Sequence, residues 1–345
     1  MLLMMGEVLR LSKVAAANPD NALLAFLAYH QTHVEWVGCS LHDLLQPSFS
    51  FLVGTALAYS MRKRLASGDS FADILRHSAW RSLILVALGI FLRSASKPMT
   101  YFTFEDTLTQ IGLGYTFLVL SSKLSDRALL LTTLALLFAY WLAWALYPLP
   151  GQSLSAHWQK GENLGTAFDR FFLNLFPRTE PFVEHRGGYC TLSFIPTLGT
   201  MMLGLLAGRQ LIAKLSVRDM ARWGILLLAS GLLVHFLGLC PIVKRIWTPS
   251  WTLASGGACF LLLAGFRLWL EDKAEAGFAF PLIVVGANSI AAYLIAHWWD
   301  GFFAASWRIH FGWLPGADAV TGLVVLTLEW LCLYWMYRNR VFLKI

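Results

Sequence analysis

Long apolar stretches separated by short polar segments dominate the chain. Crossing a bilayer as a helix takes about 20 mostly apolar residues, because every backbone amide must find its partner within the helix. The pattern predicts an all-α fold, a polytopic transmembrane helix bundle with about nine complete spans. These spans are expected at residues 45–61, 77–95, 107–122, 128–149, 191–212, 221–241, 250–270, 279–298 and 318–337.

Two segments depart from this pattern. Residues 1–9 (MLLMMGEVL) are too short to span a membrane and lack the charged start and cleavage site of a signal peptide. They resemble the second half of a truncated N-terminal helix, and a mis-called start codon is the preferred interpretation. Residues 150–190 form the one long polar connection, and loops of this length are usually functional or mobile. The remaining turns are short, so residues 1–345 are interpreted as a single integral-membrane domain.

Composition supports a membrane protein and excludes several other classes. Hydrophobic residues make up 57% of the 345 residues and charged residues only 14%, whereas a soluble domain has roughly 45–50% and 25%. These values exclude a soluble globular domain, a disordered chain and a nucleic-acid-binding domain. The net charge of +7 is instead explained by basic residues in cytoplasmic loops. Their distribution predicts a cytoplasmic C-terminus and an extracytoplasmic loop at 150–190.

The five cysteines do not form a recognisable framework. They are widely scattered, and no Cys-x-x-Cys or Cys/His spacing indicates zinc, so no metal is predicted. Cys39, Cys190 and Cys240 fall on one predicted side, which leaves a disulfide among them open.

The densest group of titratable residues precedes the first complete span. Its members are His30, His33, Glu35, Trp36, His42 and Asp43. Such residues are common in an interfacial belt at headgroup depth, which is one interpretation. The other is an active site, since a neutral imidazole accepts a proton from a nucleophile. A zinc site at His30 and His33 is a third interpretation, but no further pair of ligands is evident.

Polar and basic residues form three further candidate groups. Ser289, Tyr293 and His297 are four residues apart and share one helix face, with Asn288 beside them. These residues bind substrate or make interhelical hydrogen bonds. Basic residues can hold phosphate groups, or they can follow the ordinary positive-inside distribution. The residues selected as candidate cofactor contacts are Arg62, Arg81, Lys244 and Trp247.

Six sequence blocks, in order, resemble the heparan-α-glucosaminide N-acetyltransferase family. The first, residues 33–60, contains the His-x-x-Trp-x-Gly stretch followed by Asp-Leu and a Pro- and Phe-rich helix. The others are Trp80-Arg81-Ser82, LTQIGLGYTFLVL, LGTMMLGLLAGRQL, CPIVKRIWTPSWTL and GANSIAAY, with VFLKI at the C-terminus. The likeness covers nearly the whole chain from residue 30 onward.

The resemblance implies a membrane acyltransferase, expected in a bacterial inner membrane. Such an enzyme takes acetyl from cytoplasmic acetyl-CoA and passes it to an amino sugar or other glycan on the opposite side. The family's active histidine falls on His33, which would act as general base or transient acyl carrier. Asp43 would orient that ring and Asn288 would donate to the oxyanion. Glu35, Trp36 and His297 are the expected substrate contacts, and the resemblance is also consistent with a homodimer.

The sequence departs from the family pattern at two sites besides the N-terminus. A Gln-Arg pair is usual in the third span, whereas this chain has Gln110-Ile111. An Asp-Pro-Glu-Gly run is replaced by residues 190–193, Cys-Thr-Leu-Ser. Losing these charges removes partners for a cationic amine, which leaves both N- and O-acetylation open. A transporter or flippase and an inactive membrane scaffold are the alternative functions.

Overall fold

The computed structural model describes residues 1–149, 151–270, 277–313 and 317–343. Within these ranges the fold is all-helical, and the one β contact is an isolated bridge between Val37 and Val243. The chain divides into two compact units. Unit 1 comprises residues 1–34, 40–45 and 270–345, and unit 2 comprises residues 35–39 and 46–269.

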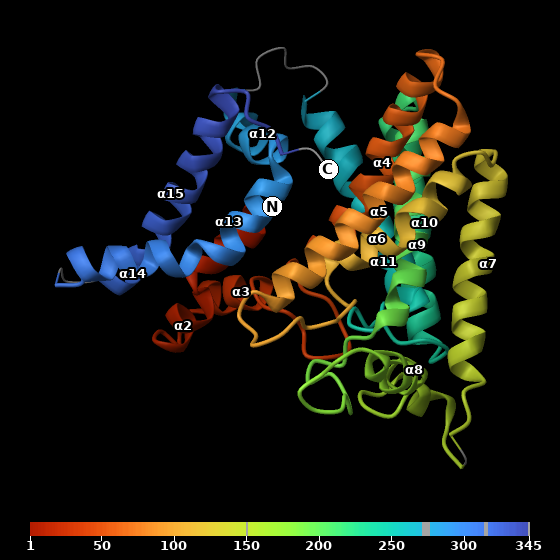
Figure 1. Cartoon of the computed structure of the whole chain (residues 1–345), viewed down its shortest axis with the longest axis horizontal. Coiled ribbons are helices and arrows are strands. Elements are labelled where there is room, and N and C mark those ends of the chain that lie inside the picture. The colour runs from red at the N-terminus through yellow and green to blue at the C-terminus, as the bar shows by residue number, and fades with distance from the viewer. Residues whose placement is uncertain (150, 271–276, 314–316, 344–345) are drawn as a thin grey trace. The chain divides into compact units, whose positions relative to one another are not determined.

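Unit 2 contains most of the long helices (Figure 1). Serine or aspartate side chains cap several of their N-termini: Ser70, Asp106, Ser125 and Ser216 each accept a hydrogen bond from a first-turn amide. The long helices are α4 (Leu45–Ala66), α5 (Phe71–Ser94), α6 (Thr107–Ser121), α7 (Asp126–Ala145), α9 (Phe194–Ile212), α10 (Val217–Phe236) and α11 (Pro249–Leu270).

Helix α9 is the central helix of unit 2. It packs against α6 and α7, and most of its residues are buried. Glycines allow its backbone to approach α4 closely, because a Cβ atom at Gly204 would lie 1.9 Å from the carbonyl oxygen of Phe51. Thr55 on α4 adds a side-chain hydrogen bond to the Gly204 carbonyl at 3.1 Å. Small residues and interhelical hydrogen bonds of this kind stabilise helix pairs in lipid, where the hydrophobic effect contributes little.

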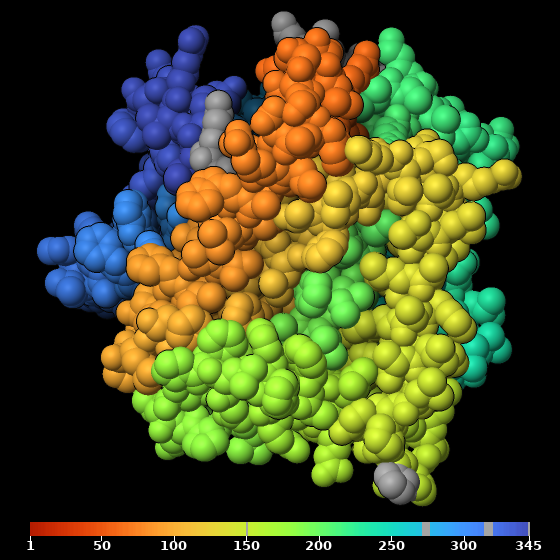
Figure 2. Space-filling model, turned by 45° about the vertical axis from the view of Figure 1, so that its right-hand side comes forward, coloured from red at the N-terminus to blue at the C-terminus, as the bar shows by residue number. Residues whose placement is uncertain are grey.

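The described residues 151–190 of unit 2 contain several short helices, and Figure 2 shows the yellow-green residues of this connection gathered in the lower part of the view. The amphipathic helix α8 is capped by Asn163, and a stacked pair of buried indoles, Trp144 and Trp158, joins α7 to this segment. Its short elements are η3 (Leu154–Trp158), α8 (Leu164–Phe172), η4 (Leu173–Leu175) and η5 (Thr191–Ser193).

Unit 1 combines the two ends of the chain. The N-terminal residues do not form one half of a long helix but a series of short ones, and η1 packs against α15. The elements from the N-terminal part are α1 (Leu2–Met5), η1 (Gly6–Leu9), α2 (Leu11–Ala16), α3 (Ala22–His30) and η2 (His42–Leu44). Those from the C-terminal part are η6 (Gly277–Ala279), α12 (Phe280–Ala287), α13 (Ser289–Trp298), α14 (Asp300–Phe311) and α15 (Ala317–Arg338).

Helices occupy all nine predicted stretches, but the structure does not confirm nine spans. Among the described residues, five helices are long and apolar enough to cross a membrane: α5, α7, α9 with η5, α11 and α15. Helix α6 is apolar but has only 15 residues, and charged residues occupy the end of α4 and the start of α10. The stretch 279–298 breaks at Asn288 into α12 and α13, which meet at 74°. Counting this pair as one span gives six.

The close α4–α9 contact predicts that replacing a glycine by alanine destabilises the protein at Gly204 but not at Gly265. Gly204→Ala forces two helix backbones apart, so we expect the free energy of unfolding in detergent to fall by about 2 kcal/mol. Gly265→Ala on α11 is the matched control, because no atom lies within 4 Å of its Cβ position. Unfolding midpoints measured for both variants check this, and an equal effect of the two substitutions would contradict the packing described.

Candidate active site

A buried carboxylate organises the segment that follows α3 in unit 1. The Asp43 side chain is 2% exposed and lies 2.8 Å from the Nδ1 atom of His33. Its Oδ2 atom accepts hydrogen bonds from the Val34 and Ser40 amides and from the Ser40 hydroxyl. The structure therefore brings together the predicted pair His33 and Asp43. An ionised Asp43 carboxylate can only accept hydrogen bonds. The contact therefore places a proton on the Nδ1 atom of His33 and makes Nε2 the basic nitrogen of that ring.

A second histidine lies against the first. The ring centroids of His33 and His42 are 4.5 Å apart. The Nε2 atom of His42 is 2.9 Å from the Glu7 carboxylate, which comes from η1. Burial raises the pKa of Glu7, but the hydrogen bond from His42 and the charges of His42, His33 and His297 outweigh it, so the pKa is lowered overall.

Sequence reasoning missed Glu7. Residues 1–9 were interpreted as part of a lost helix, and nothing in that apolar segment indicates that its one carboxylate folds back onto His42. His30, in contrast, has a local role, because its Nδ1 atom accepts the Leu41 amide hydrogen bond at 3.2 Å.

Asn288 occupies the break between α12 and α13. Its side-chain amide donates to the carbonyl of Val341 at 2.9 Å, and its Oδ1 atom accepts from the Leu343 amide at 3.1 Å. These bonds hold the end of the described chain. His297 stacks on Tyr293, one turn earlier in α13, with ring centroids 4.2 Å apart. The predicted shared face of α13 is thus confirmed at these two positions.

The predicted cofactor and substrate contacts in unit 2 lie in different settings. Arg81 donates to the Tyr115 hydroxyl at 3.3 Å, whereas Arg62 is exposed. Lys244 and Trp247 are buried, and the Trp247 indole donates to Thr200.

Two of the predicted acceptor contacts also lie in unit 2. Glu35 is exposed, and the Trp36 indole donates to the carbonyl of Trp158. Their predicted roles in binding acetyl-CoA and acceptor stay predictions.

A basic hollow in unit 2 was not predicted as such. It has a volume of about 420 Å³ and is lined by residues of α4 and α5: Arg64, Asp73, Arg76, His77 and Trp80. Arg64 pairs with Asp69 at 2.7 Å and Arg76 with Asp73 at 3.4 Å. Guanidinium groups beside an indole suit phosphate and adenine, so these residue types fit a nucleotide-containing cosubstrate.

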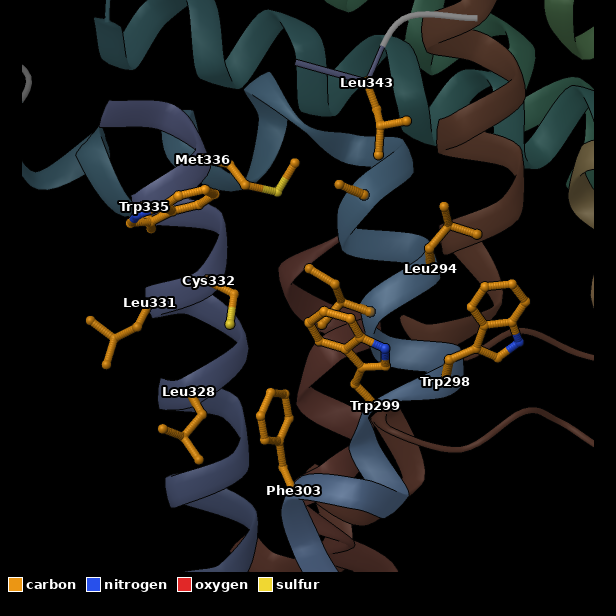
Figure 3. Close-up of a pocket in the computed structure, with 12 residues that line it drawn as sticks. Leu294, Trp298, Trp299, Phe303, Leu328, Leu331, Cys332, Trp335, Met336 and Leu343 are labelled. Atoms are coloured by element: carbon orange, nitrogen blue, oxygen red, sulfur yellow. The ribbon is translucent and has the colours of Figure 1, made fainter. Parts of the chain in front are cut away.

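Unit 1 also contains an apolar cavity of about 560 Å³ between α13, α14 and α15 (Figure 3). Trp298, Trp299 and Phe303 line one side, and Leu328 and Leu331 come from α15. The lining residues include no carboxylate, imidazole, amine or guanidinium group, so this cavity is not a candidate catalytic site.

Loop residues of unit 2 form a separate titratable group. Burial raises the pKa of Glu105 to about 7, against the opposing charge of Arg93. Burial also raises the pKa of Asp169 to about 6, although a hydrogen bond from Thr191 opposes it. The pKa of His185 is lowered to about 4 by burial and by the Arg93 charge.

Cys190 and Cys240 are buried free thiols, so the structure has no disulfide among Cys39, Cys190 and Cys240. The described parts of the chain also contain no group of three or more His, Cys, Asp and Glu side chains arranged to hold a metal ion.

Comparison with known proteins places the chain in a family context. It is 23% identical to human (Homo sapiens) heparan-alpha-glucosaminide N-acetyltransferase over 371 residues, which cover 91% of this chain and 55% of that protein. The mouse (Mus musculus) protein of the same name gives 23% identity over 375 residues, covering 91% and 56%. The chain is therefore similar, at low identity, to two heparan-alpha-glucosaminide N-acetyltransferases. The chain spans about half the length of these two proteins. No protein-family model matches its sequence.

The raised pKa of Glu105 predicts a pH-dependent stability. An acid whose pKa is higher in the folded state stabilises the fold when protonated, and this contribution disappears as the pH rises through that value. We expect the free energy of unfolding to fall by up to about 3 kcal/mol between about pH 5 and pH 8. Glu105→Gln keeps the site neutral and should reduce this fall, whereas Glu162→Gln in the same part of unit 2 should leave it unchanged. Unfolding in detergent across this pH range measures both, and an equal pH dependence in wild type and Glu105→Gln would contradict the expectation.

Proposed function

We propose that this chain is a membrane acyltransferase that moves acetyl from cytoplasmic acetyl-CoA to an amino sugar or other glycan on the extracytoplasmic side. The observation that carries the proposal is the His33–Asp43 pair, at the position where the family has its active histidine. The similarity to two N-acetyltransferases over 91% of the chain also supports it. The apolar helices agree with an integral membrane protein, here assigned to a bacterial inner membrane with a cytoplasmic C-terminus.

The proposed chemistry depends on one imidazole. An ammonium group cannot attack a thioester until it loses a proton, and an imidazole with a pKa near 6.5 in its free form accepts one at neutral pH. His33 is 38% exposed, so its ring is accessible while Asp43 holds it from the buried side. Asp43 fixes the tautomer and stabilises the charged ring. His33 then acts as general base or as transient acetyl carrier, and both roles use Nε2.

The basic hollow between α4 and α5 is the proposed site for the phosphates of acetyl-CoA, with Arg62 and Arg81 as further basic residues. Asn288 is assigned to positioning the C-terminal segment, because both ends of its amide are engaged there. Glu35, Trp36 and His297 remain the proposed acceptor contacts. A hydroxyl acceptor is included in the proposal because the acidic run usual before the fifth span is absent.

A transporter is the second candidate function. The observation that favours it is the 74° break between α12 and α13, since broken helices form substrate sites in many transporters. Such sites usually use paired breaks in two halves of the protein, and the described residues contain one bent pair. Uptake of labelled glucosamine into proteoliposomes without acetyl consumption would support this candidate.

Loss of His33 tests the acyltransferase directly. Purified chain is given acetyl-labelled acetyl-CoA and glucosamine, and transfer is followed by product analysis. We expect His33→Ala to lower the rate at least about 100-fold, because general acid–base catalysis contributes that much. Acetyl-CoA binding should be unchanged.

His30→Ala is the matched control, three residues away, and should retain most of the activity. An undiminished rate in His33→Ala would remove this residue from the mechanism. A wild-type chain that transfers no acetyl to an amine or a hydroxyl acceptor would contradict the proposed function itself.

A further inference from the structure

His42 has one ring nitrogen that the folded chain leaves unsatisfied. Its side chain is 4% exposed, and its Nε2 atom is held by Glu7 at 2.9 Å. Its Nδ1 atom is buried and has no hydrogen-bond partner in the described structure. Leaving a buried polar atom unpaired costs about 1–3 kcal/mol. A buried polar atom without a partner is uncommon in folded proteins and needs an explanation.

The contact with Glu7 determines what Nδ1 can do. The pKa of Glu7 is lowered, so its carboxylate is ionised at neutral pH and accepts the Nε2 proton of His42. In the neutral ring the other nitrogen is then a bare acceptor. His42 and Glu7 thus form a histidine–carboxylate pair in which the Nδ1 atom of His42 carries no proton and can accept one. This pair lies against the His33–Asp43 pair, with the ring centroids of His42 and His33 4.5 Å apart.

We propose that His42, positioned by Glu7, is the base that takes the proton from the amine or hydroxyl of the acceptor. This inference rests on the proposed function and deepens it, because it assigns the proton step to His42 and leaves His33 to act at the acetyl group. The arriving N–H or O–H group would supply the hydrogen bond that Nδ1 lacks in the folded chain.

The proposed step balances in atoms and charge. A bond forms between the acceptor nitrogen or oxygen and the acetyl carbon, and the bond from that carbon to its carrier, the CoA sulfur or His33 Nε2, breaks. The acceptor's proton passes to His42 Nδ1. A thiolate leaving group takes one proton from water, whereas a departing neutral imidazole of His33 needs none. His42 returns to its starting tautomer when its Nδ1 atom releases the accepted proton to water, while Nε2 keeps its proton and its contact with Glu7.

Several charged groups of unit 1 surround this pair and bear on its pH dependence. His33 lies against the ring, and Asp43 follows His42 in η2. The charges of His33 and His297 act on Glu7. Asp300, at the start of α14, is influenced by both Arg10 and Glu7.

Two substitutions test the inference. His42→Gln removes the base, so we expect turnover with glucosamine to fall at least about 100-fold while acetyl-CoA affinity stays within about twofold. Glu7→Gln keeps an oxygen that accepts the Nε2 proton but removes the negative charge beside the imidazolium. We therefore expect a smaller loss, about tenfold, and an acid limb of the pH–rate profile that moves to lower pH. A purely structural role for Glu7 would not move that limb.

His235→Gln is the matched control, because its Nδ1 atom is also buried without a partner but it lies on α10 in unit 2. It should retain wild-type turnover and pH profile. An active wild type whose His42→Gln variant turns over normally, or an unshifted profile in Glu7→Gln, would overturn this inference and leave the proposed function intact. A wild-type chain without acetyl transfer would overturn both.

Discussion

The buried carboxylate of Asp43 is the contact on which the candidate site depends. Hydrogen bonds from the main chain at Val34 and Ser40 fix its position, and the remaining oxygen holds the His33 ring. A carboxylate in this setting is stable only while its donors are in place. The same bonds therefore shape the loop and orient the imidazole, which links the folding of this short segment to its proposed chemistry.

The helices of unit 2 are held together in a different way, by close contacts between their backbones. Their apolar side chains gain little by leaving lipid, so close backbone approach and hydroxyl hydrogen bonds replace the hydrophobic effect as the source of specificity. Gly54, Gly204 and Gly208 allow the contact between α4 and α9, and Thr55 bonds across it. Packing at this distance gives α4 a rigid position in unit 2. The basic hollow, whose lining residues come from α4 and α5, is supported by it.

Sequence patterns predicted some of these features well. The length of the apolar stretches located every long helix, because backbone hydrogen bonding in lipid permits few alternatives. The family resemblance implied that Asp43 orients the His33 ring, and the two side chains lie 2.8 Å apart in the structure. The structure does not confirm nine spans, and the residue pattern does not reveal that Asn288 ends one helix and begins another at a steep angle. Nor does it reveal Glu7, because its contact with His42 is non-local in sequence and lies in a segment without polar periodicity.

The central claim is that Asp43 holds the proton of His33 on Nδ1 and leaves Nε2 basic. Nitrogen-15 NMR of histidine-labelled protein reports directly which ring nitrogen carries the proton, and Asp43→Asn assigns the signal. The account predicts a protonated Nδ1 and an unprotonated Nε2 for neutral His33 in the wild type, with this preference lost in Asp43→Asn. A His33 ring protonated on Nε2, or one that is indifferent to the substitution, would contradict it.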